Sequence, residues 1–252
     1  MLAAGRAAEA GAEVLLLEKN ASPGSKILIS GKTRCNVSNS KELEEFIPMF
    51  GANGRFLYSA FSRFFREDLL ALLKRYGVET KTERGGRIFP VSDNAEDVVR
   101  ALKKYTADNN ISFQTGVKVT DIITMDGQIT GVKTETQTYP AMAVIIATGG
   151  ASYPATGSTG DGCRMASALN HTIVTLRPSL VPLVVEEIEL AKSMQGVTLK
   201  NVRLTAYQCA SEEIDSSIAP VKDCGRGIPG KKPKTPVIES RMGDMMMTHF
   251  GI

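Results

Sequence analysis

The sequence contains few of the residues on which metal, disulfide or nucleophilic chemistry is usually built. Its 252 residues include no tryptophan, two histidines and four cysteines. The cysteines are far apart and form no C-x-x-C pair, which argues against a zinc site and a disulfide framework. With only His171 and His249, histidine catalysis and metal binding have little material. We therefore predict no metal site.

Charge and long hydrophobic runs are also scarce. Thirty basic and 27 acidic side chains leave a net charge of +3, which is too small to indicate nucleic acid or an anionic membrane as a partner. No signal peptide or transmembrane run is visible, so we expect a cytoplasmic protein. The hydrophobic content of 42% is normal for a globular protein, so a core can form in one large or two modest domains.

A short apolar run, Val14 to Leu17, is followed directly by Glu18. In a dinucleotide-binding βαβ unit, an acidic residue there accepts hydrogen bonds from a ribose hydroxyl, about 20 residues after the first glycine of G-x-G-x-x-G. An alanine-rich segment over 2–10, closed by Gly11, predicts the preceding helix. The strand and glycine loop that should come first would lie before Met1, so we expect the phosphate cradle to be absent. The alternative is a surface strand that ends in an acidic residue.

A second signal is the loop ISGKTRCNVSN, residues 29–39. Gly31 and its small polar neighbours can bring backbone N–H groups close to a phosphate or a flavin ring. Lys26 and Arg34 could neutralise a pyrophosphate. An ordinary polar loop is the alternative. Cys35, beside Arg34, would be reactive if its pKa were lowered, although a buried packing role is more common for a single cysteine.

A third signal is the segment IIATGGASYPATGSTGDG, residues 145–162. The run 143–147 predicts a buried strand that ends in a glycine turn. In open α/β sheets, ligands bind at this carboxyl edge. Asp161 could hold a ribityl or ribose hydroxyl there, or it could simply cap the helix predicted over 162–169.

Periodicity predicts an α/β fold with a parallel sheet covered by helices. Helical spacing is found over 56–76 and over 95–109, the latter capped by Ser92 or Asp93. Between Ile111 and Ala147 the period changes to two, with a turn at Asp126-Gly127. From Arg177 onward, alternating segments without a convincing helix predict a β-rich second domain, which includes an exposed Gly, Pro and Lys-rich loop over 223–236.

Taken together, the motifs KILISGKTRCNVSN, GRIFPVSDNAEDVV, ATGGASYPATGSTGDGCRMA and GDMMMTHFGI give the chain its family resemblance. It resembles the BaiN-like family of FAD-dependent oxidoreductases, also known as aminoacetone-oxidase-family FAD-binding enzymes. The resemblance implies a Rossmann-like, two-dinucleotide-binding-type FAD domain over 1–176 and part of an inserted β-rich domain over 177–252. It also implies hydride transfer through FAD, a small-molecule substrate and, in many members, NAD(P)H.

The resemblance also assigns cofactor-binding residues. Glu18 would bind the adenosine ribose, and Val119 would offer backbone contacts to the adenine. Asp161 would contact FAD from the TGDG segment. The remaining implied contacts, around the flavin, its pyrophosphate and the second glycine turn, are Lys19, Lys26, Gly31, Arg34, Cys35, Asn36, Ala147, Thr148, Gly149 and Gly150. No catalytic residue is assigned, and Arg34 and Asn36 are the best candidates near the ring.

The sequence departs from the family at both ends and in one loop. The family's N-terminal strand and G-x-G-x-x-G loop are expected before Met1, its sequence continues past Ile252, and members commonly have glycines where Lys32 and Thr33 stand. Two alternatives therefore stay open beside the flavoprotein: an incomplete fragment without activity, and a nucleotide- or NAD(P)-binding protein without flavin. For this chain alone we expect poor solubility and weak flavin retention.

Overall fold

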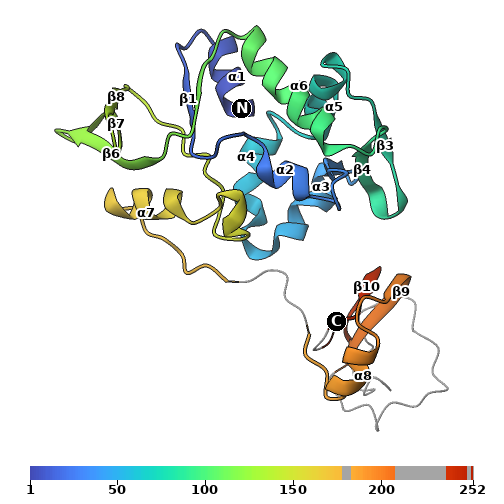
Figure 1. Ribbon diagram of the computed structural model, residues 1–252. Coiled ribbons are helices and arrows are strands. Elements are labelled where there is room, and N and C mark those ends of the chain that lie inside the picture. Colours follow the sequence, from blue (N-terminus) through green and yellow to red (C-terminus); the bar gives the residue numbers. More distant parts are fainter. Residues whose placement is uncertain (178–182, 208–236, 249–250, 252) are drawn as a thin grey trace, which may run out of the picture. The chain divides into compact units, whose positions relative to one another are not determined.

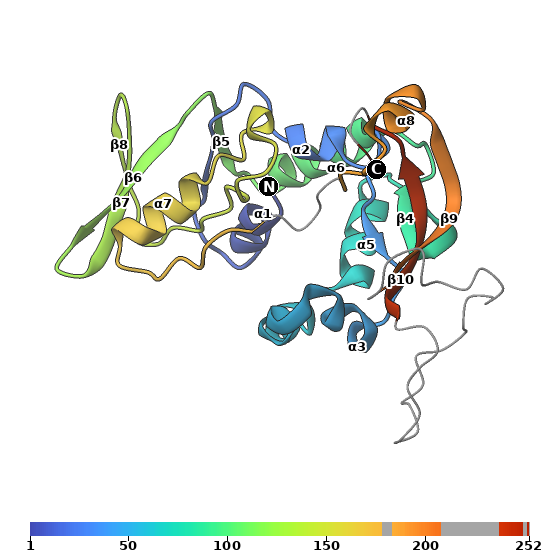
Figure 2. The ribbon, with the colours of Figure 1, turned by 90° about the horizontal axis from the view of Figure 1, so that it is seen from below.

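The computed structural model describes residues 1–177, 183–207, 237–248 and 251. The chain divides into two compact units, Met1–Leu176 and Arg177–Ile252. Helices and strands are mixed along the first unit (Figures 1 and 2), so the predicted α/β class is confirmed. Among the described residues, no helix is both long and apolar enough to cross a membrane.

A parallel strand pair lies at the centre of the predicted nucleotide-binding unit. Strand β1 (Leu15–Glu18) pairs with β5 (Ser112–Thr115) from Leu15 opposite Ser112 to Glu18 opposite Thr115. Helices α1 (Leu2–Glu9) and α6 (Ala95–Asp108) lie side by side next to β1 (Figure 1). A Cβ at Gly5 would overlap the ring of Tyr105, which is fully buried. The small residues of α1 therefore allow close packing on α6.

Helix α6 supplies one face of the hydrophobic core. Its buried side chains pack with residues from α5 (Arg66–Arg75) and from the loop after α2 (Ser25–Ile29); the buried cluster is Cys35, Leu73, Val78, Ala95, Val98 and Ala101. The predicted cap at Ser92 or Asp93 is wrong. Asn94 is the N-cap, and its side-chain oxygen accepts a hydrogen bond from Glu96 N at 3.0 Å, because it stands directly before the first helical residue.

The helix predicted over 56–76 is confirmed in its C-terminal half as α5, but it is not continuous. It is preceded by α4 (Tyr58–Phe61), by a 3₁₀ segment η1 (Ile47–Leu57) and, before the predicted range, by α3 (Leu43–Phe46). The break falls at Phe65, whose backbone is extended, and the Asp68 carboxylate accepts a hydrogen bond from Phe65 N at 2.8 Å to start α5. Phe65 packs edge-on against Phe46, with ring centroids 5.3 Å apart, so aromatic packing outweighs continuous helical spacing.

Two small antiparallel sheets complete the first unit. One has the order β2-β4-β3, and the other is the predicted meander β6-β7-β8. Asp126 and Gly127 both have positive φ, as a tight hairpin turn requires. The predicted last helix is confirmed as α7 and follows a 3₁₀ turn, η3. The bounds are β2 (Ser38–Asn39), β3 (Thr80–Thr82), η2 (Arg84–Gly86), β4 (Arg87–Pro90), β6 (Val119–Met125), β7 (Gln128–Thr134), β8 (Thr138–Pro140), η3 (Pro154–Thr156) and α7 (Asp161–Ala168).

The buried strand predicted over 143–147 is not formed. These residues belong to no helix or strand, and Ile145 and Ile146 are 64% and 42% exposed. No strand in the described part of the chain pairs with this segment. An apolar run becomes a strand only when a neighbouring strand satisfies its N–H and C=O groups, so composition alone was an insufficient guide here.

The second unit is built on a long antiparallel pair, β9 (Thr198–Tyr207) and β10 (Val237–Met246). The prediction of no helix there is wrong, because α8 spans Ile188–Ser193 and buries Ala191. The short helix was missed because it offers little more than one turn of pattern. The predicted loop over 223–236 lies outside the described residues.

Candidate functional site

The carboxyl end of β1 is joined to the 149–161 segment by charged and polar contacts. Asn20 N donates to Glu18 Oε1 at 2.8 Å, which orients the carboxylate predicted to bind ribose. Lys19 Nζ lies 2.6 Å from Asp161 Oδ2 and 2.7 Å from Thr159 Oγ1. This bond from Lys19 lowers the pKa of the Asp161 carboxyl, with a smaller contribution from Thr159. Two residues predicted for the site, 142 positions apart, are thus directly paired.

Lys26 joins the same segment by different contacts. Its Nζ donates to Ser152 O at 2.9 Å, to Ser152 Oγ at 3.0 Å and to Ser158 Oγ at 3.2 Å. These acceptors are neutral, and no carboxylate of the described residues forms an ion pair with Lys26. Lys19 and Arg34, in contrast, are each paired with a carboxylate. Among the three predicted site cations, Lys26 is therefore the one that forms no ion pair within the described residues.

Arg34 is held by the structure around it. Its guanidinium donates to both carboxylate oxygens of Glu83, at 2.8 and 3.2 Å, and to Asp93 Oδ1 at 3.1 Å. The guanidinium carbon also lies 4.0 Å from the centroid of the Phe89 ring. The bond to Glu83 is the largest cause of the raised pKa of Arg34 and of the lowered pKa of Glu83. These contacts fix the 29–39 loop and reduce the charge that Arg34 offers to a pyrophosphate.

The neighbours of Arg34 differ in accessibility. Cys35 is 5% exposed in the core cluster, and burial raises the pKa of its thiol, so the packing role is favoured over a reactive thiolate. Asn36 is exposed, and its side-chain amide faces the carbonyl oxygens of Ser38 and Ile88. A Cβ at Gly31 would lie 2.8 Å from Asn36 N and 3.0 Å from the Phe89 ring, which explains why a glycine stands there.

Backbone strain concentrates on the two loops predicted to bind the cofactor. Nine non-glycine residues of the described ranges have positive φ, and five of them are Asn or Asp, which tolerate this conformation. The other four are Lys32, Thr33, Cys35 and Tyr153. All four lie within 29–39 or 145–162. Strained residues of this kind cluster at ligand-binding sites, so this distribution makes each of the two loops a candidate ligand-contacting segment.

The glycine turn of the 145–162 segment is open on one side. Gly150 has no atom within 4 Å of an ideal Cβ, whereas a Cβ at Gly149 would meet Ser158 Oγ at 3.2 Å. Gly162 at the start of α7 packs against the Thr148 side chain, and Ala147 is exposed. Of the predicted turn residues, Gly149 packs against Ser158 and Thr148 packs against Gly162, whereas Ala147 and Gly150 are accessible.

Val119 begins strand β6 shortly after a contact with β1. Val117 N donates to Glu18 O at 2.9 Å, so the chain that leads into β6 starts beside Glu18. In the described part of the chain, no hydrogen bond or ion pair links the 31–36 loop to Glu18, Val119 or the 148–161 segment. The structure thus pairs Lys19 directly with Asp161 and bonds Lys26 to Ser152 and Ser158 of the same segment. Arg34, Cys35 and Asn36 form a separate group along the chain.

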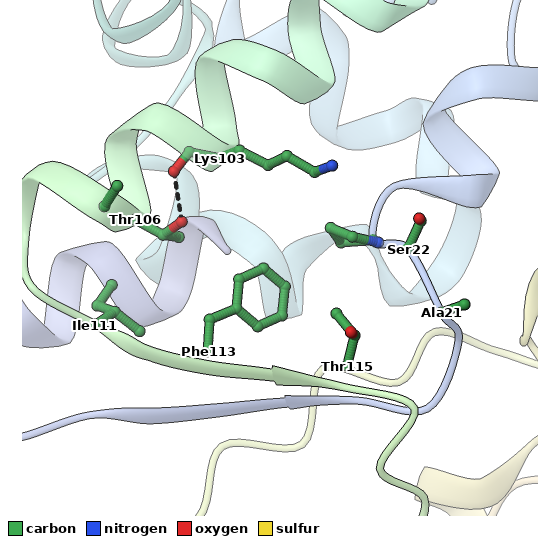
Figure 3. A pocket seen from close by; sticks show the side chains of 9 residues that line it. Ala21, Ser22, Lys103, Thr106, Ile111, Phe113 and Thr115 are labelled. Carbon is green, nitrogen blue, oxygen red and sulfur yellow. Dashed lines mark hydrogen bonds between the residues drawn. The ribbon is translucent and has the colours of Figure 1, made fainter.

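A separate pocket of about 350 Å³ lies between α6, β5 and the loop after β1. Figure 3 shows Phe113 pointing from β5 toward α6, with Lys103 extending from α6 toward Ser22. Thr106 Oγ1 donates to Lys103 O at 2.7 Å and is not free to bind a ligand as a donor. None of the predicted cofactor residues lines this pocket.

Several residues that shape the site were missed in the sequence. Asn20 Nδ2 donates to Thr156 O at 3.1 Å, and Ser152 and Ser158 hold Lys26. Tyr153 combines positive φ with 66% exposure. Small polar residues between glycines are typical of any loop, so only the residue type at Tyr153, an aromatic among glycines and serines, could have drawn notice.

Residues 1–214 match the model of one protein family, described as the HI0933-like protein Rossmann domain. A curated relative, the 3-dehydro-bile acid delta(4,6)-reductase of Clostridium scindens, is 31% identical over 182 residues, which are 72% of this chain and 44% of the relative. The ribosomal RNA dihydrouridine synthase of Escherichia coli is 28% identical over 204 residues, 80% of this chain and 50% of that protein. The chain thus spans about half the length of these relatives or less.

One solved structure is also similar, an oxidoreductase from Methanosarcina mazei. The similarity covers 72% of this chain and 40% of that one, at 16% sequence identity and a TM-score of 0.24. A TM-score this low does not establish a common arrangement of the elements. The assignment of the chain to a family therefore rests on the match over residues 1–214.

Proposed function

Because the chain belongs to the HI0933-like Rossmann-domain family, we propose that it carries the FAD-binding part of a flavin-dependent oxidoreductase. The observation that supports this most strongly is the position of the strain. Lys32, Thr33, Cys35 and Tyr153 adopt positive φ in the two loops that resemble FAD-contacting motifs. Such conformations cost free energy and persist where the backbone must approach a ligand.

The donors around these loops fit a dinucleotide. Glu18 presents an oriented carboxylate for ribose hydroxyls, and the Lys26 ammonium has only neutral partners among the described residues. The backbone N–H groups of Gly31, Lys32 and Thr33 make no hydrogen bond within the described part of the chain. Free N–H groups and a cation are the donors that bind phosphate or the carbonyl edge of a flavin.

In this proposal, bound FAD supplies hydride transfer and the chain supplies position and charge. Glu18 would hold the ribose, and Lys26 lies at Ser152 and Ser158, shortly after the turn Gly149-Gly150. Asp161 acts through Lys19, to which it is paired. NAD(P)H is the proposed electron donor.

The names of the two curated relatives suggest a substrate class. A 3-dehydro-bile acid delta(4,6)-reductase acts on carbon–carbon double bonds of a 3-oxo compound, and a dihydrouridine synthase reduces the double bond of a uracil ring. In both substrates the reduced bond is conjugated to a carbonyl group. We therefore propose a small molecule or nucleobase with such a bond as the electron acceptor, which receives a hydride and a proton across its C=C bond.

A titration of FAD with the purified 252-residue chain tests the proposal. We expect a saturable rise in flavin fluorescence anisotropy, even at modest affinity, because the site is assembled from several donors. The variant Glu18→Ala should weaken binding, and the matched variant Glu13→Ala, which removes an exposed carboxylate just before β1, should not. No saturable change up to millimolar protein, or equal effects of the two variants, would contradict the proposal.

A nucleotide-binding protein without flavin is the second candidate. Two contacts favour it, the pairing of Lys19 with Asp161 and the hydrogen bond from Asn20 N to Glu18. Both orient side chains at the proposed ribose site, and neither involves the proposed site of the flavin ring. Binding of ADP-ribose or NADH with no binding of riboflavin would support this candidate over the flavoprotein.

A further inference from the structure

Tyr153 occupies an unfavourable position for an aromatic residue. Its backbone is left-handed, with φ 56° and ψ 65°, and 66% of the residue is exposed. This conformation is unfavourable for an L-residue with a bulky side chain. Its neighbours Gly149, Gly157 and Gly160 adopt positive φ without that cost. A glycine would therefore satisfy the backbone better than Tyr153 does.

Thr156 contacts the backbone of Tyr153, and Lys26 lies near its ring. Thr156 donates to Tyr153 O from its backbone N at 2.9 Å and from its Oγ1 at 2.8 Å. Lys26 Nζ, bonded to the preceding residue Ser152, lies 5.8 Å from the Tyr153 ring centroid, within cation–π range. The backbone of Tyr153 is thus held by Thr156, and its ring lies beside a cation while most of the residue is exposed.

A planar ligand with a polar edge fits these features. An exposed aromatic ring can stack on any flat ring system. The Lys26 ammonium beside it can donate to a carbonyl oxygen or balance a negative charge at the edge of that ring. A phosphate ligand without a ring would bind Lys26 but would leave the Tyr153 ring uncovered.

We propose that Tyr153 is the stacking residue for the flavin ring and that Lys26 binds the polar edge of the same ring. This inference rests on the proposed FAD-binding function and adds the residue that recognises the ring rather than the nucleotide. The strain at Tyr153 is maintained because the ring–ring contact needs an aromatic side chain at this point of the loop.

Three probes separate the parts of the ligand. FAD carries both ring and nucleotide, riboflavin carries the ring without phosphates, and ADP-ribose carries the nucleotide without the flavin. The variant Tyr153→Ala should weaken FAD and riboflavin about tenfold, in line with the loss of one stacking contact, and should leave ADP-ribose binding unchanged. Tyr153→Phe should retain flavin affinity, since it keeps the stacking ring.

A glycine at this position separates stacking from folding. Tyr153→Gly should raise the midpoint of thermal unfolding, because glycine relieves the left-handed strain, and should weaken riboflavin as much as Tyr153→Ala does. The matched control is Phe56→Ala, which removes an aromatic residue that is 87% exposed elsewhere in the first unit. This control should change neither flavin affinity nor ADP-ribose affinity.

The outcomes distinguish the inference from the function on which it rests. If the wild-type chain binds neither FAD nor riboflavin, the proposed function fails and the inference fails with it. If the wild-type chain binds both and Tyr153→Gly binds them equally well, only the stacking role is overturned. An equal loss of ADP-ribose affinity in Tyr153→Ala and Tyr153→Gly would also overturn it, because the effect would then be on the loop and not on the ring.

Discussion

Lys19, directly after strand β1, and Asp161, the first residue of α7, form an ion pair of 2.6 Å with both side chains mostly buried. The pair fastens the 149–161 segment to the strand that carries Glu18. Its partners are 142 residues apart in the sequence, so the contact depends on the tertiary fold. It therefore gives a direct measure of whether the candidate site is assembled as described.

We expect Asp161→Asn to lower the free energy of unfolding by about 1 kcal/mol, as for a favourable but incompletely buried ion pair. Lys19→Met should have a similar effect, and the double variant should lose less than the sum because the two residues act together. Urea unfolding of the four proteins measures the coupling. Additive losses would mean that the pair does not form in solution.

The stability of the first unit should fall on the acid side. The pKa of Asp161 is lowered chiefly by its bond from Lys19, that of Glu83 by its bond from Arg34, and that of Asp93 by its bond from Lys81. A carboxyl whose pKa is lower in the folded than in the unfolded chain stabilises the fold at pH values above its unfolded pKa. This stabilisation is lost as the pH falls through the folded pKa. Thermal unfolding midpoints should therefore decline below a pH of about 4.

The control for the acid prediction is Asp161→Asn, which removes one of the titrating groups. Its unfolding midpoint should depend less steeply on pH over the same range than that of the wild type. A wild-type midpoint that rises on acidification would show that these carboxylates are not held by their cationic partners.

Thr33→Gly should increase stability, because Thr33 is a β-branched residue with φ 66°. The relief of left-handed strain, about 1–2 kcal/mol, exceeds the entropic cost of a more flexible unfolded chain, about 0.4–1 kcal/mol. Asp126→Gly serves as the control, since aspartate already tolerates its positive φ of 53°. Chemical denaturation compares the two. A loss of stability in Thr33→Gly would mean that the loop does not have this conformation.

Gly5→Ala should destabilise the chain even though alanine is the better helix former. A Cβ at this position overlaps the Tyr105 ring, and overpacking of this kind costs about 1–3 kcal/mol. In a Tyr105→Ala background the same substitution should become neutral or stabilising, because the space is then free. If Gly5→Ala stabilises the wild type, α1 and α6 do not pack as closely as the structure indicates.

The sequence predicted the parts of the fold that rest on local pattern. The helix over α6, the hairpin turn at Asp126-Gly127 and the strand before Glu18 are confirmed. The failures arise where distant contacts decide. The run 143–147 lacks a neighbouring strand in the described chain, and the aromatic packing of Phe65 interrupts a helical pattern. Hydrophobic periodicity does not report either effect.

For the site, the sequence named candidate segments, of which the end of β1 and the 149–161 segment are in contact, but it did not show how their charges are balanced. Lys19, Lys26 and Arg34 look equivalent in the sequence as cations beside a glycine loop. The structure pairs Lys19 with Asp161 and Arg34 with Glu83, and leaves Lys26 on neutral oxygens. The strain at Tyr153 was equally invisible, because a dihedral angle at a non-glycine residue has no signature in composition.

The measurement that tests the account most directly is amide hydrogen exchange of the chain with and without saturating FAD. The account predicts slower exchange in two separate segments, 29–39 and 148–161, because both loops would contact one ligand, with little change in β9 and β10. Protection confined to the pocket residues around Lys103 and Phe113, or no protection at all, would contradict the assignment of these loops to a flavin site.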